Sequence, residues 1–269
     1  MADRDGTAAG SGTAARPAAG RPDPGTELAP GGTLWFLDFD GVLCDSLPEC
    51  YAVSRTAYWT GFLGVPEPPA SAPEEAEFAR MRPLIRRGAD YLLLHLAIRE
   101  GIRLVSQGDF DALAAREAER DELFHELFYR ARRDLLGRDP ERWFALNPLY
   151  PGVREILLRN RLNRAVLILS TKEAPFILEI LKQHGVEWES DRVLCSRKEP
   201  KLRFIDRILS ERGARRAVFV DDQIDHFQGA SDHPVRCVLA DWGYVRPEWI
   251  ESGTFETVSL TGLPALLPA

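Results

Sequence analysis

The segment "WFLDFDGVLCDS" places the carboxylates of Asp38 and Asp40 directly after a short apolar run. Residues two apart in a strand point to the same side of a sheet, so both acids can face one site while Phe39 faces away. Gly41 follows them and permits a tight turn of the backbone. We interpret Asp45, a further acid of the segment, as a capping or solvated residue. A single Asp-X-Asp pair is common in turns and helix caps, so this segment alone defines no function.

A second acidic segment, "VFVDDQID", also follows an apolar run and contributes Asp221, Asp222 and Asp225. Ligands of open α/β sheets bind beyond the carboxyl ends of the strands, so two neighbouring strands would bring as many as five carboxylates to one place. Their repulsion and desolvation would cost on the order of several kcal/mol. A hard divalent cation offsets this cost, and oxygen ligands suit Mg²⁺. The two segments together therefore predict a magnesium site.

Short apolar segments predict the strands of one parallel sheet: 33–40, 164–170, 191–196, 216–220 and 235–240. They are apolar throughout, as strands covered on both faces are. Amphipathic helical segments lie between them, such as "APFILEILKQHG", in which Gly185 is placed as a C-cap. This alternation is typical of a doubly wound α/β domain.

Residues 47–148 interrupt the alternation and contain helical segments but no convincing strand. In "DELFHELFYRARRDLL" we expect Leu123, Phe124, Leu127 and Phe128 on one face, packed in a core. The sequence therefore predicts a helical domain inserted after the first strand. The predicted organisation is a disordered tail over 1–31, an α/β core formed by 32–46 and 149–269, and a helical cap over 47–148.

Composition excludes several classes of protein. The 269-residue chain carries a net charge of −7, which argues against nonspecific binding to nucleic acid or anionic membranes. Its four cysteines are scattered, so neither a zinc site nor a disulfide scaffold is predicted. No apolar run reaches the roughly 18 residues of a membrane span, and the start of the chain lacks a signal-peptide core. We expect a cytoplasmic monomer or homodimer.

The segments "DFDGVLCDS", "LILSTK", "KEPK" and "VFVDDQID", in that order, resemble the four motifs of haloacid dehalogenase-like hydrolases. The resemblance extends over about residues 33–245, and "DWGY" is similar to a late segment of phosphoglycolate-phosphatase-like members. It implies a Rossmann-like core with an inserted cap, Mg²⁺ as cofactor, and hydrolysis of a small phosphorylated metabolite through an aspartyl-phosphate. It also implies magnesium ligation by the following residues: Asp38, Asp40 through its main-chain carbonyl, Asp221, Asp222 and Asp225.

The resemblance gives each motif residue a role. Asp38 would be the nucleophile and Asp40 the general acid and base, which favours phosphoryl transfer because family dehalogenases lack the second aspartate. Ser170 would donate a hydrogen bond to a phosphoryl oxygen, or it would cap the following helix. Thr171 stands where related phosphatases often have asparagine, so its contact with phosphate stays open. Gly41 belongs to the same substrate-binding turn.

The sequence offers more than one cationic partner for the acids. Lys198 and Lys201 both lie in "SRKEPKLRFI", and either could bridge nucleophile and phosphate; Lys201 is favoured by its spacing to the following apolar pair. His226 is interpreted as a surface residue or as a contact behind the ligands. Arginines in "RMRPLIRRG" either bind a second anionic group of the substrate or form a solvated helix face: Arg80, Arg82, Arg86 and Arg87.

Three other functions could use the same acidic segments or the same fold. A phosphomutase would pass the phosphoryl group to a sugar instead of water. A catalytically inactive binding protein of the same fold is disfavoured by the presence of Asp38 and Asp40. A glycosyltransferase that holds a metal–nucleotide complex with an Asp-X-Asp pair is disfavoured by the second acidic cluster.

Overall fold

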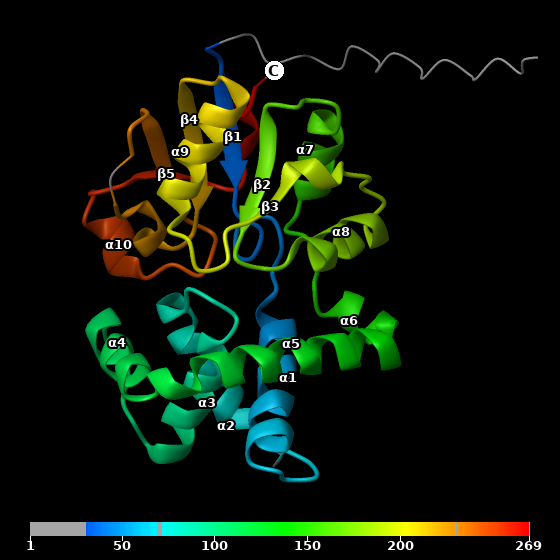
Figure 1. The fold of residues 1–269 in the computed structure, drawn as a ribbon, viewed down its shortest axis with the longest axis vertical. Coiled ribbons are helices and arrows are strands. Elements are labelled where there is room, and N and C mark those ends of the chain that lie inside the picture. The colour runs from blue at the N-terminus through cyan, green and yellow to red at the C-terminus, as the bar shows by residue number, and fades with distance from the viewer. Residues whose placement is uncertain (1–30, 69–71, 230, 269) are drawn as a thin grey trace, which may run out of the picture.

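The computed structural model describes residues 31–68, 72–229 and 231–268. The predicted tail thus lies outside the described residues, apart from Gly31. Figure 1 shows two layers, an upper α/β unit that holds the sheet and a lower unit made of helices. The chain leaves the sheet after its first strand, forms the helical unit, and then returns to complete the sheet.

All six strands of the sheet are parallel, in the order β3-β2-β1-β4-β5-β6. Their bounds are β1 Thr33–Leu37, β2 Val166–Ser170, β3 Val193–Cys195, β4 Arg216–Asp221, β5 Val235–Ala240 and β6 Glu256–Val258. The five predicted strands and the doubly wound α/β class are confirmed. Strand β6 was missed because it is short and largely exposed, and so carries no apolar run. The strand order reverses between β1 and β4, which is where ligands bind in such sheets.

Helices cover both faces of the sheet because successive strand residues point to opposite sides. Leu34 and Phe36 of β1 pack in a buried cluster with residues of α9, such as Ile205. Leu37 instead belongs to the larger cluster, which includes Ile177 of α8 and continues into the cap. The helices of this unit are α7 Val153–Asn160, α8 Ala174–Gln183, α9 Lys201–Arg212, α10 Pro247–Glu251 and α11 Leu263–Leu266.

The inserted segment is helical, as predicted. Its α-helices are α1 Leu47–Thr56, α2 Ala72–Met81, α3 Asp90–Glu100, α4 Gln107–Arg116, α5 Asp121–Arg138 and α6 Pro140–Ala145. A π-helical segment, η1 Ala57–Phe62, continues α1, and two short 3₁₀ turns of this segment are η2 Arg82–Leu84 and η3 Ala118–Arg120. Two further 3₁₀ turns, η4 Ser190–Arg192 and η5 Ile224–Phe227, belong to the α/β unit. The domain boundaries at 47 and 148 stay a prediction.

Helix α5 corrects one expectation about the cap core. Phe124, Leu127 and Phe128 are buried, whereas Leu123 is 44% exposed. One residue turns a helix by about 100°, so the residue before Phe124 lies at the edge of the apolar stripe. The aromatic residues are therefore core, as predicted, and Leu123 is not.

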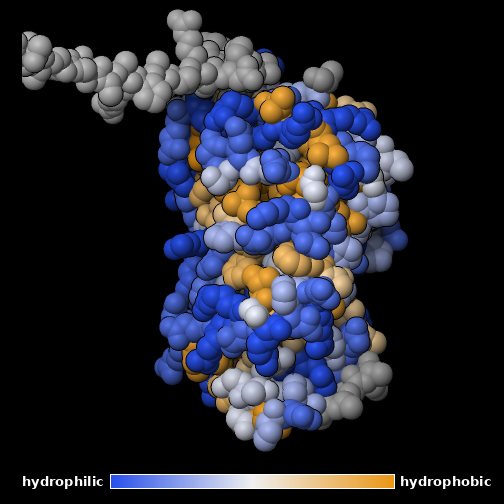
Figure 2. Space-filling view, turned by 90° about the vertical axis from the view of Figure 1, so that its right-hand side faces the viewer, coloured by the Kyte–Doolittle hydropathy of each residue, from blue (hydrophilic) through white to orange (hydrophobic). Residues whose placement is uncertain are grey.

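The surface is mostly hydrophilic on the face shown in Figure 2, with apolar side chains in separate small groups. Among the helices that the structure describes, none combines the length and the apolar character needed to cross a bilayer.

Replacing Phe36 by alanine should destabilise the fold by about 3–5 kcal/mol, because the ring is fully buried in the central strand and leaves a cavity. Leu162→Ala is the matched control, since Leu162 is 65% exposed and should change stability by less than about 0.5 kcal/mol. Urea unfolding of both variants measures the difference. Similar losses in the two variants would show that β1 is not central to the core.

Candidate active site

The carboxyl ends of three adjacent strands form the floor of the candidate site. β1 ends before Asp38, β4 ends at Asp221, and β2 ends at Ser170. The Asp38 N–H donates to Val220 O at 2.9 Å, which continues the β1–β4 pairing to the first acid. The two acidic segments therefore lie side by side, as the sequence predicts.

Asp38 and Asp221 share one buried cation, Lys201. Its ammonium lies 3.0 Å from Asp38 Oδ1 and donates to Asp221 Oδ2 at 2.8 Å. Lys201 begins α9, and its side chain is 1% exposed. His226 Nδ1 lies 2.9 Å from the same Asp221 oxygen. Of the two candidate lysines, the structure brings Lys201 to the acids.

Burial controls the charge state of these acids. Burial raises the pKa of Asp38 above its usual range, although Lys201 opposes the shift. Burial would also raise the pKa of Asp221, but His226 and Lys201 outweigh it and hold the pKa low. The pair therefore has one carboxylate that its neighbours hold ionised and one whose ionised form is made less favourable by burial.

A magnesium ion fits this group. Asp38, Asp221 and His226 each offer a ligand atom, and these atoms lie within 4.8 Å of one another. Two carboxylates suit a hard cation, whereas an imidazole nitrogen is unusual for magnesium, and His226 already contacts Asp221. A bound cation also lowers the pKa of adjacent carboxyls, so it would oppose the effect of burial on the pKa of Asp38. The donor chemistry thus supports Asp38 and Asp221 as the ligands.

Asp40 has a partner that the sequence did not indicate. Lys172, two residues beyond β2, lies 2.7 Å from Asp40 Oδ1 and is 2% exposed. Burial would raise the pKa of Asp40, but Lys172 outweighs it and holds the pKa below its usual range. Asp40 is therefore ionised in the free protein.

Asp222 lines the cavity together with Asp38 and Asp40 and also contacts the "DWGY" segment. Its Oδ2 accepts from the Tyr244 N–H at 2.8 Å. Burial raises the pKa of Asp222. The positive charge of Arg82 opposes this rise, and the negative charge of Asp221 adds to it. The Arg82 guanidinium lies 4.2 Å from the centroid of the Tyr244 ring. Asp222 thus packs the "DWGY" segment against the site.

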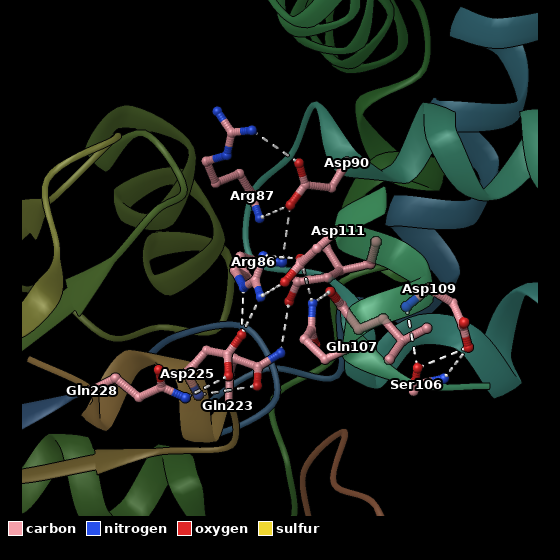
Figure 3. Close-up of polar contacts among 12 residues, drawn as sticks. Arg86, Arg87, Asp90, Ser106, Gln107, Asp109, Asp111, Gln223, Asp225 and Gln228 are labelled. Carbon is pink, nitrogen blue, oxygen red and sulfur yellow. Dashed lines mark hydrogen bonds and ion pairs between the residues drawn. The ribbon is translucent and has the colours of Figure 1, made fainter. Parts of the chain in front are cut away.

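Asp225 faces the cap instead of the paired acids. Its Oδ2 accepts from Arg86 Nε at 2.5 Å, and Arg86 Nη1 lies 2.7 Å from Asp111 Oδ1 (Figure 3). The neighbouring Gln223 donates its Nε2–H to the carbonyls of Pro83 and Ile85 at 2.7 and 3.2 Å. The acidic segment after β4 is therefore also the place where the cap docks.

Ser170 and Thr171 line the cavity, whereas Lys198 lies outside the acid cluster. Ser170 is buried and its Oγ accepts from the Lys172 N–H at 3.2 Å, so it does not cap α8. Thr171 donates to the Arg86 carbonyl at 3.3 Å and lines the cavity. Lys198 is 59% exposed and pairs with Asp121 of the cap at 2.9 Å, outside the acid cluster.

The arginines of the 80–87 segment do not form one solvated face, because Arg82, Arg86 and Arg87 line the cavity.

A cavity joins these groups between core and cap. It has a volume of about 30 Å³ and is lined by Asp38, Asp40, Ser170, Lys172 and Asp222, with arginines from the cap. A second cavity of about 370 Å³ shares Arg87, Tyr129 and Thr171 with it. The space beside Asp38 is therefore narrow, and a wider space lined by Arg87, Tyr129 and Thr171 adjoins it.

Comparison with known proteins identifies the family. The sequence pattern of haloacid dehalogenase-like hydrolases matches residues 34–233. The chain belongs to this family. No curated protein matches the sequence.

Several solved structures share the fold. A haloacid dehalogenase-like hydrolase from Bacteroides fragilis has a TM-score of 0.59 and 13% identity, over 88% of this chain and 100% of the other. A protein described as a predicted phosphoglycolate phosphatase from Haemophilus somnus has a TM-score of 0.57 and 18% identity, over 88% and 98%. A predicted phosphatase from Clostridium acetobutylicum has a TM-score of 0.54 and 12% identity, over 88% and 98%.

Several site residues of this haloacid dehalogenase-like hydrolase were missed in the sequence. Lys172 ends the segment "LILSTK" but was given no role, although its place after a strand that ends at the site was a usable signal. Glu49 and Arg132, which form a buried pair beside Lys172, are 83 positions apart. Such partners become visible only when the cap helices pack.

Gly41 is required by its surroundings in this hydrolase. Its φ is +89°, and a Cβ at this position would lie 2.1 Å from Asp222 Oδ2. Gly64 is a matched control, since its φ is +69° and its Cβ would meet nothing within 4 Å in the described part of the chain.

Gly64→Ala should cost about 1–2 kcal/mol of unfolding free energy from left-handed backbone strain. Gly41→Ala should cost at least about 1 kcal/mol more, because the Asp222 carboxylate must also move. Chemical unfolding of both variants measures the two costs. Equal values would mean that Asp222 does not constrain the turn.

Proposed function

We propose that the protein is a Mg²⁺-dependent phosphatase that hydrolyses a small phosphomonoester through an aspartyl-phosphate on Asp38. The observation that carries the proposal is the buried group of Asp38, Lys201 and Asp221, in which Asp38 lines the cavity together with Asp40. The similar folds described as predicted phosphatases are consistent with it.

The first step forms a bond between an Asp38 oxygen and phosphorus and breaks the bond from phosphorus to the alcohol oxygen. Asp40 gives its proton to the departing alcohol. Its pKa is low in the free protein, but a phosphate dianion bound nearby raises the pKa of a carboxyl through like-charge repulsion. Asp40 therefore takes up a proton as substrate binds, and the alcohol carries that proton away.

The second step is hydrolysis. The ionised Asp40 removes a proton from water, the water oxygen attacks phosphorus, and the bond to Asp38 breaks, which frees inorganic phosphate. Lys201 and the Ser170 hydroxyl stabilise the negative charge of the phosphoryl oxygens. A magnesium ion held by Asp38, the Asp40 carbonyl and Asp221 would supply further positive charge to the phosphoryl group.

The proposal predicts release of inorganic phosphate from 4-nitrophenyl phosphate and from a panel of small phosphomonoesters in the presence of Mg²⁺. Asp38→Asn should lower kcat on the order of 10³-fold or more, because the nucleophile is lost. EDTA should abolish turnover, and added Mg²⁺ should restore it. Asp191→Asn, at an exposed ion pair with Arg164, is the matched control.

Wild-type protein that releases no phosphate from any member of the panel would refute the phosphatase proposal. Transfer of the phosphoryl group to a second sugar without phosphate release would establish the phosphomutase instead. Measuring free phosphate and phosphorylated product in the same assay separates the two.

The two lysines give a second prediction. Lys201→Met leaves Asp38 and Asp221 without their shared cation, so kcat/KM should fall by at least about a hundredfold. Lys198→Met removes an exposed pair and should change kcat/KM by less than about twofold. Steady-state kinetics with 4-nitrophenyl phosphate measure both; a larger loss in Lys198→Met would reverse the assignment.

A further inference from the structure

Four charged side chains of alternating sign form a row from the cavity into the cap: Asp40, Lys172, Glu49 and Arg132. Lys172 Nζ lies 2.7 Å from Asp40 Oδ1 and 3.9 Å from Glu49 Oε2. Arg132 donates to both Glu49 oxygens, at 2.7 and 2.8 Å. The last three side chains are at most 2% exposed, so they depend on one another for compensation of charge.

The Glu49–Arg132 pair is held firmly inside the cap. Trp143 Nε1 donates to Glu49 Oε1 at 3.2 Å, and the Arg132 guanidinium lies 4.5 Å from the centre of the Phe128 ring. A buried ion pair adds little net stability, because desolvation offsets the attraction. Stability alone therefore gives little reason for these charges among aromatic rings.

Lys172 needs fixed partners to stay in place. Its ammonium ends a flexible four-carbon stem and can donate three hydrogen bonds. Besides Asp40 and Glu49, it reaches Asn147 Oδ1 at 3.4 Å. Arg132 repels Lys172, and Glu49 stands between the two cations and attracts both. Without the Glu49 charge, Lys172 would face an unscreened arginine.

We propose that Glu49, clamped by Arg132, is a positioning residue that holds Lys172 against Asp40 and so fixes the direction of the Asp40 carboxylate. The inference rests on the proposed function, in which Asp40 exchanges protons with the leaving group and with water. Glu49 lies on α1 and Arg132 on α5, which pack together in the cap, whereas Lys172 follows β2 of the core. Through this row the cap acts on the acid–base carboxylate, and Arg132 of the row also lines the cavity.

Glu49→Gln keeps the shape of the side chain and removes its charge. Correct placement of Asp40 matters for glycerol phosphate, whose alcohol leaves poorly, and far less for 4-nitrophenyl phosphate, whose phenolate leaves readily. We expect kcat on glycerol phosphate to fall about tenfold to a hundredfold, and kcat on 4-nitrophenyl phosphate to change less than about threefold. KM should stay the same for both, and initial rates with Mg²⁺ measure the split.

Two variants control the experiment. Glu77→Gln removes an exposed cap pair with Arg80, 2.6 Å long, and should leave both rates unchanged. Glu49→Gln with Arg132→Met removes the buried pair as a unit, which avoids an unpaired buried arginine and keeps the test possible if the single variant fails to fold. It should show the same selective loss. Equal losses on the two substrates, or no loss, would overturn the proposal.

A wild-type protein with no turnover on either substrate would refute the phosphatase function, and crystal structures of the same variants would then decide the positioning claim. Departure of Lys172 from Asp40 in the variants supports it. A Lys172–Asp40 contact still at 2.7 Å overturns it.

Discussion

The structure depends on how it compensates the negative charge gathered where β1 and β4 end. Parallel pairing of these two strands forces Asp38 and Asp221 together, and both are almost completely buried. Ionised carboxylates in such a place require positive charge close by. The first residue of α9 supplies it, since Lys201 reaches both acids. The strand order therefore creates one electrostatic requirement, and the placement of Lys201 at the start of α9 meets it.

The cap continues the same compensation from the other side. Arg82 opposes the raised pKa of Asp222, Arg86 binds Asp225, and Arg132 balances Glu49 beside Lys172. The acids near the cavity are thus paired with cations from other elements than their own, and Asp38 and Asp221 share one of these cations. The cap is therefore part of the electrostatics of the site as well as its cover, and its packing and the charge state of the core acids are coupled.

How far the sequence predicted this arrangement depends on the range of each interaction. The strands, the inserted helices and the two acidic clusters follow from apolar runs and from residues a few positions apart. Lys201 could be favoured over Lys198 from local spacing, but only the fold shows that Lys198 pairs with the cap. Asp225 could not be assigned to Arg86, which is 139 positions away, because no local pattern encodes the docking of the cap. Glu49 was missed for the same reason, because its partner Arg132 is 83 positions away.

The closeness of cap and core also constrains how a ligand could enter. The segment that carries Asp221 toward the cavity carries Gln223 and Asp225 toward the cap, where they bind the 83–86 loop. The cavity of about 30 Å³ is narrow, and Ile85 and Arg86 of that loop line it, so movement of the loop would widen the way to Asp38. Moving it breaks contacts made by residues two and four positions beyond Asp221. Access to the nucleophile and the arrangement of the second acidic cluster are therefore changed by the same motion, since one short segment serves both.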